Sequence, residues 1–161
     1  LLQHAIDSIT STFFTQVMFA DFELQAHRLV EQDQPITAEV LSTIYSGLLR
    51  EYYGDVLDDE PLSAMTWARI PHFFSTPYYV YQYATCFAST ARLMQDLRAQ
   101  DAGRRSEAVE RYLSLLKAGG SDYPMNLLAR AGVDLSQPDT VRAVSEELGM
   151  LVGKLEHELG V

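Results

Sequence analysis

The chain has 161 residues, of which 47% are hydrophobic, and a formal net charge of −10. This length and composition predict one globular domain with a substantial core, while the negative charge argues against nucleic acids and anionic membranes as partners. No apolar run approaches the roughly 20 residues of a membrane span. The lone Cys86 excludes an intrachain disulfide and fits a reducing cytoplasm.

Apolar residues recur at helical spacing through the first part of the chain. One such stripe predicts a long first helix that ends before Pro35, since proline cannot continue it. Thr37 is a good N-terminal cap for a second helix, and Gly54 is a good stop for it. Residues 55–76 contain prolines and an acidic run, and they predict an irregular connection with one short helix around 62–67.

Helical spacing continues to the end of the chain. Thr76-Pro77 predicts the start of a third long helix, because proline suits the first helical position. A fourth helix is expected to stop at Gly119-Gly120, a short one to start at Pro124 and a last long one at Pro138. No segment alternates as a strand does, so the predicted fold class is all-α, a multi-helix bundle forming one domain over residues 1–161.

The usual sequence signatures of metal, redox and phosphate sites are absent. There is no His-Glu-x-x-His, no Cys-x-x-Cys and no phosphate-binding glycine loop. Glu23 and His27 are four residues apart, and Glu156 and His157 are adjacent, so neither pair has the Glu-x-x-His spacing of di-iron bundles. We therefore expect this chain to bind no metal by itself.

The most informative segment is residues 70–83, in which His72 lies in a predicted loop between prolines. Four tyrosines follow it closely: Tyr78, Tyr79, Tyr81 and Tyr83. An imidazole and several phenols beside a helix N-terminus can donate hydrogen bonds to a carbonyl or to the oxyanion formed from it. The alternative is a set of aromatic rings packed in a core with their hydroxyls at the surface. On the predicted helix, Tyr78 and Tyr81 would share one face and Tyr79 and Tyr83 another.

Two carboxylates, Asp21 and Glu23, interrupt an apolar part of the predicted first helix. They belong either to a solvated helix face or to a cavity wall where they face polar partners. The segment from Ala118 to Pro124 contains two glycines. It is either a plain connector between helices or a mobile loop that contacts a ligand.

Four motifs in order then suggest a family. They are Phe14–Glu23, Pro71–Phe74 with Pro77–Thr85, Leu116–Pro124 and Ala131–Leu135. Together they resemble oligoendopeptidase F, a zinc metallopeptidase family related to thimet oligopeptidase. The resemblance implies the C-terminal part of a channel-forming helical peptidase.

In that family, the zinc ligands are the two histidines of His-Glu-x-x-His and a later glutamate, all upstream of the part matched here. The resemblance therefore implies a cytoplasmic parent enzyme that uses zinc to hydrolyse short peptides, and a fragment that is inactive alone and binds no zinc. Tyr81 would donate its hydroxyl to the tetrahedral oxyanion, and His72 would hydrogen-bond the substrate or intermediate. Tyr78 and Tyr79 would contact the substrate.

Another class of function fits the same helices. The chain could be a non-catalytic helical module that binds peptides or other proteins. Under the fragment hypothesis, we also expect apolar faces that the missing part of the enzyme would cover, and self-association to cover them. The candidates for such exposed residues are Phe19, Phe22, Tyr45 and Tyr52.

Overall fold

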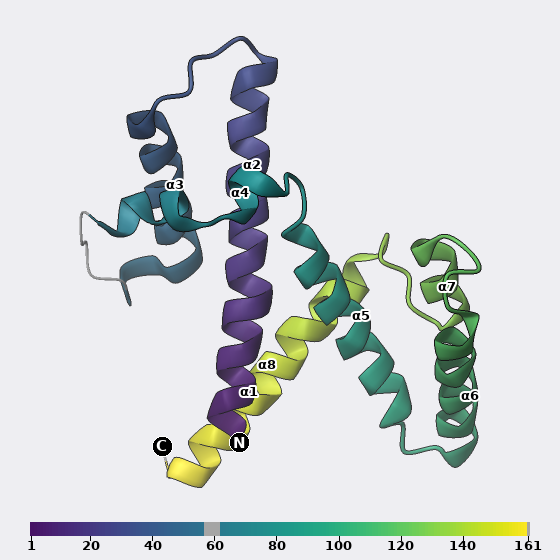
Figure 1. The fold of residues 1–161 in the computed structure, drawn as a ribbon. Coiled ribbons are helices and arrows are strands. Elements are labelled where there is room, and N and C mark those ends of the chain that lie inside the picture. The colour runs from purple at the N-terminus through teal and green to yellow at the C-terminus, as the bar shows by residue number, and fades with distance from the viewer. Residues whose placement is uncertain (57–61, 161) are drawn as a thin grey trace. The chain divides into compact units, whose positions relative to one another are not determined.

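A computed structural model describes residues 1–56 and 62–160 (Figure 1). It divides into two compact units, one of residues Ser11–Ala84 and one of Leu1–Thr10 with the described residues from Thr85 onward. Among the described residues there are helices and no strand, which confirms the all-α prediction. The expectation of a single domain over residues 1–161 stays a prediction. Residues 57–61, part of the expected irregular connection, lie outside the described part.

The predicted first helix is present as three consecutive helical segments. They are α1 (Leu2–Ile9), a π-helical stretch η1 (Thr10–Phe14) and α2 (Thr15–Glu31). Where α1 meets η1, the Thr10 hydroxyl donates a hydrogen bond of 3.0 Å to the Ile6 carbonyl oxygen. The last segment ends at Glu31, ahead of Pro35, so the predicted end of this helix is confirmed.

The second helix, α3 (Ala38–Tyr53), has the ends that the sequence predicts. The Thr37 side chain accepts a hydrogen bond from the Val40 N–H at 3.2 Å, and Gly54 takes a left-handed φ of 60°. The connection that follows is more helical than expected. It contains the 3₁₀ segments η2 (Gly54–Val56) and η3 (Ser63–Arg69) and the single-turn helix α4 (His72–Ser75).

An aromatic core holds the unit of residues 11–84 together. Its buried members are Met18, Phe19, Phe22, Tyr45, Leu48 and Val80. The expectation that Phe19, Phe22 and Tyr45 are exposed is therefore wrong, and Tyr52 is half-buried against this core. The reason is that α2, α3, η3 and α4 converge on these rings, whereas the sequence pattern predicts mostly irregular chain for η3 and α4.

The other unit contains most of α5 (Tyr81–Leu97), together with α6 (Ala102–Ala118), α7 (Pro124–Arg130) and α8 (Pro138–Leu159). Helix α1 packs against α8, and α6 against α7. The predicted starts at Pro124 and Pro138 and the stop at Gly119 are confirmed. The predicted start at Pro77 is wrong, because α5 begins at Tyr81. None of the described helices is long and apolar enough to cross a membrane.

The connector before α7 is fixed by Asp122. Its carboxylate accepts hydrogen bonds from the Tyr123 N–H at 2.8 Å and the Asn126 amide at 3.0 Å, and it pairs with Arg130. These local contacts favour the plain connector over the ligand-contacting loop.

Candidate functional site

His72 is positioned by the aromatic core. It is the first residue of α4, so the prediction that it lies in a loop is wrong. The next residue, Phe73, packs its ring 5.6 Å from that of Phe19 and 5.0 Å from that of Phe22, centroid to centroid. The packing of Phe73 therefore fixes the backbone from which the half-buried imidazole projects.

Two tyrosines pack directly on the His72 ring. Tyr79 stacks on it with centroids 5.5 Å apart and an interplanar angle of 4°. Tyr83 meets both rings edge-on, with centroids 6.1 Å from His72 and 5.4 Å from Tyr79. A hydrogen bond with Tyr79 is the main cause that raises the pKa of Tyr83 above its usual value. The sequence correctly grouped these tyrosines with the histidine.

Tyr78 adopts an unusual backbone conformation. Its φ is +57°, a left-handed value that is rare for a residue with a bulky side chain. Its N–H donates a hydrogen bond of 2.7 Å to Oε1 of Glu23. Because this conformation is not helical, α5 cannot extend back through Tyr78, and the predicted shared face of Tyr78 and Tyr81 does not form.

Glu23 is buried, with 4% of its surface exposed, so the solvated-face interpretation is wrong for this residue. Its carboxyl group faces a polar partner, the Tyr78 amide, while the expected cavity wall at this position stays a prediction. Asp21 is half-buried and accepts a hydrogen bond of 3.0 Å from Gln25.

His27 belongs to the same contact and was not predicted. Its ring centroid lies 4.5 Å from that of Tyr78, and its Nδ1 lies 2.8 Å from the Glu23 carbonyl oxygen. The sequence signal for this contact is the spacing of Glu23 and His27 by one helical turn, which places both residues on one face of α2.

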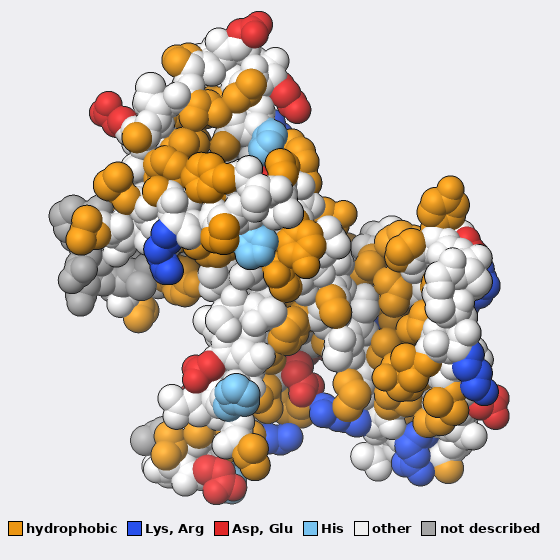
Figure 2. Space-filling view, in the orientation of Figure 1, with side chains coloured by type: hydrophobic (Ala, Val, Ile, Leu, Met, Phe, Trp, Pro, Cys, Tyr) orange, Lys and Arg blue, Asp and Glu red, His pale blue; other side chains and the backbone are white. Residues whose placement is uncertain are grey.

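Tyr81 stands at the first position of α5 with half of its surface exposed. Val80, immediately before it, is fully buried in the aromatic core. The buried Val80 thus anchors a turn whose flanking phenols, Tyr79 and Tyr81, reach the surface. Figure 2 shows hydrophobic side chains gathered on the unit of residues 11–84, with histidine side chains among them.

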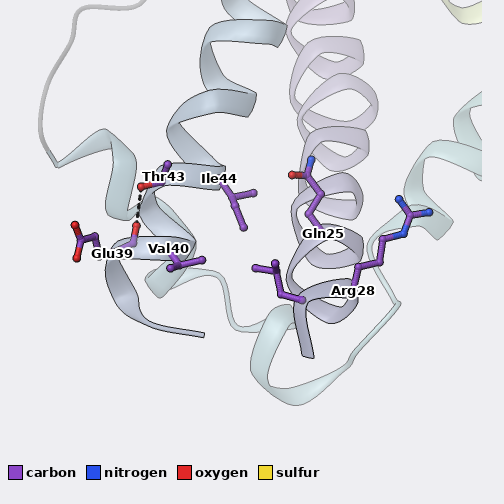
Figure 3. A pocket seen from close by; sticks show the side chains of 7 residues that line it. Gln25, Arg28, Glu39, Val40, Thr43 and Ile44 are labelled. Carbon is purple, nitrogen blue, oxygen red and sulfur yellow. Dashed lines mark hydrogen bonds between the residues drawn. The ribbon is translucent and has the colours of Figure 1, made fainter. Parts of the chain in front are cut away.

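A separate groove lies between α2 and α3, with a volume of about 510 Å³ (Figure 3). Leu29, Val40 and Ile44 make its apolar lining, while Arg28 and Glu39 are at its polar edge. None of the predicted site residues lines this groove, so its position gives no support to their roles.

The described residues do not form a metal centre. Among residues 1–56 and 62–160 there is no group of three or more His, Cys, Asp or Glu side chains that could hold a metal ion. The residues present therefore do not fit a zinc site within this part of the chain.

The fold and the site define an all-α protein that presents an imidazole and several phenols from an aromatic core. The profile of peptidase family M3 matches residues 1–147, and the chain belongs to this family.

Similar proteins support this family assignment. The chain is 36% identical to "Oligopeptidase PepF" of Bacillus subtilis over 99% of this chain and 23% of that protein. It is 41% identical to an "Oligoendopeptidase F homolog" of Borreliella burgdorferi over 84% of this chain and 22% of that protein. The crystal structure of oligoendopeptidase-F from Enterococcus faecium superposes with a TM-score of 0.87 at 35% identity, over 97% of this chain and 29% of that one. The chain thus spans about a quarter of the length of these proteins.

Proposed function

We propose that this chain is the substrate-binding and oxyanion-stabilising part of a zinc-dependent oligoendopeptidase that hydrolyses short peptides in the cytoplasm. The observation that carries the proposal is the stack of His72 on Tyr79, with Tyr83 edge-on, and the exposed Tyr81 between these two tyrosines in the sequence. Membership of peptidase family M3 supports a peptidase, and the relatives named oligoendopeptidases support short peptides as substrates.

Each side chain has a distinct role in this proposal. The Tyr81 hydroxyl donates a hydrogen bond to the oxyanion that forms when the peptide carbonyl is attacked. His72 hydrogen-bonds the bound peptide or the intermediate, and Tyr78 and Tyr79 contact the substrate. Removing one donor to an oxyanion typically lowers the rate about 100- to 1,000-fold.

Zinc, in this proposal, is bound by residues of the full-length protein that lie outside this chain. The described residues provide no ligand group of their own. We therefore expect the chain alone to be inactive, and the roles above involve only hydrogen bonds from its own side chains.

The proposal is tested on the full-length protein with a short internally quenched peptide. We expect cleavage together with about one zinc ion per molecule, and a His-Glu-x-x-His motif upstream of Leu1. His72→Ala should lower kcat and raise KM, because the imidazole contacts both the bound peptide and the intermediate. A protein that binds such peptides without cleaving them, and that lacks the motif, would instead be a non-catalytic helical binding module.

A further inference from the structure

The contact between Glu23 and Tyr78 joins a buried carboxyl group to a strained backbone. The two residues are 55 positions apart in the sequence, and the carboxylate accepts the amide hydrogen at 2.7 Å. Because Glu23 is only 4% exposed, water is poorly placed to replace it.

The turn that contains Tyr78 has little freedom on either side. Phe73 is packed against the core before it, and Val80 is fully buried after it. Between these anchors, Tyr78 takes the left-handed φ of +57° that bulky residues avoid. Such a conformation persists only where its surroundings stabilise it.

His27 also helps to hold Tyr78 in place. Its Nδ1 lies 2.8 Å from the Glu23 carbonyl oxygen, which fixes the ring, and the ring packs on that of Tyr78. One helical turn of α2 therefore contacts both the amide and the side chain of Tyr78.

We propose that Glu23 is a positioning residue, whose buried carboxylate holds the left-handed turn at Tyr78 and thereby sets the placement of Tyr79 and Tyr81. This inference rests on the proposed function, because Tyr79 and Tyr81 are its substrate-contacting and oxyanion-stabilising groups. Glu23 itself touches no reacting atom.

The kinetic test uses the full-length protein and the quenched peptide. Glu23→Leu removes the acceptor but suits an apolar surrounding, and it should lower kcat about 30-fold with KM within about threefold, as a small misplacement does. Glu23→Gln keeps an acceptor oxygen and should stay within about threefold of the parent. Asp21→Leu, on the same helix, is the matched control and should also stay within about threefold.

A second variant, Tyr78→Gly, distinguishes a positioning role of Glu23 from a general loss of folding. Glycine adopts positive φ without strain, and its lack of a ring lets water reach the amide. In a Tyr78→Gly background, Glu23→Leu should therefore lower kcat less than about threefold further. An equal loss in both backgrounds, or a Glu23→Gln variant as slow as Glu23→Leu, would overturn the proposal.

Hydrogen–deuterium exchange of a peptide covering residues 77–81 provides a readout that needs no activity. Exchange of the Tyr78 amide should be at least about tenfold faster in Glu23→Leu and unchanged in Asp21→Leu. If the full-length protein cleaves no peptide, the proposed function fails while the exchange still tests the Glu23 contact. Unchanged exchange in Glu23→Leu would overturn the positioning role whatever the kinetics.

Discussion

The two units of this chain are built from different kinds of core. Residues 11–84 pack large aromatic rings, including Phe19, Phe22 and Tyr45, around α2 and α3. The other unit packs mainly small side chains, which are Ala88, Ala108, Ala131, Val133, Ala143 and Val144. Its surface carries ion pairs such as Arg98–Glu147. The aromatic core therefore stabilises its unit and also fixes the backbone next to His72, Tyr79 and Tyr81.

Phe22→Ala should have the largest effect on stability. Phe22 is buried and its ring packs against those of Tyr45, Trp67 and Phe73, so truncation leaves a large cavity and should cost about 3–5 kcal/mol. Val144→Ala, at an equally buried position of the other unit, removes much less apolar surface and should cost about 1–3 kcal/mol. Urea unfolding of both variants gives the comparison, and equal losses would contradict the contrast between the two cores.

Alkaline pH should weaken the aromatic core selectively. Burial is the main cause that raises the pKa of Tyr45 to about 12, with the neighbouring Tyr53 adding to it and Arg69 opposing it. An unfolded tyrosine titrates near pH 10, so the stabilisation from the protonated phenol is fully present below that pH. It should be lost as pH rises from 10 to about 12, by roughly 2 kcal/mol.

Unfolding free energies measured across this pH range provide the test. Tyr45→Phe, which keeps the ring and cannot ionise, should lack this part of the loss. A pH dependence identical in both proteins would mean that Tyr45 is not its source.

Arg98→Ala should have the smallest effect. Arg98 pairs with Glu147 at 3.1 Å, but more than half of its side chain is exposed, and exposed ion pairs contribute at most about 1 kcal/mol. Adding salt should shrink the difference in unfolding free energy between parent and variant. A loss as large as that of Phe22→Ala would show that surface charge, and not the packed interior, stabilises this unit.

Local signals were enough to predict most of the fold. The cap at Thr37, the stop at Gly54 and the prolines at 124 and 138 act within a few residues of the helix ends that they set. The late start of α5 could not be predicted this way. Pro77 is a good local helix start, and the contact that overrides it comes from Glu23 on a distant helix.

The candidate site could be predicted only in part, because some of its contacts are local in the sequence and others are not. His72, Tyr79 and Tyr83 are close in sequence, so a local pattern is enough to predict their grouping. The burial of Glu23 and the packing of His27 on Tyr78 depend on how α2 meets the turn, which no local pattern in the sequence specifies.

The central claim is that Tyr81, at the start of α5, donates a hydrogen bond to the oxyanion. The most direct test compares kcat of Tyr81→Phe with kcat of Tyr78→Phe in the full-length protein. Both substitutions keep the ring and remove only a hydroxyl. Tyr81→Phe should lower kcat about 100- to 1,000-fold with KM within a few-fold, because such a donor acts mainly in the transition state. Tyr78→Phe should be mild, since the observed contacts of Tyr78 are those of its backbone N–H and its ring. If kcat were unchanged in Tyr81→Phe but fell strongly in Tyr78→Phe, the assignment of Tyr81 as the donor would be contradicted.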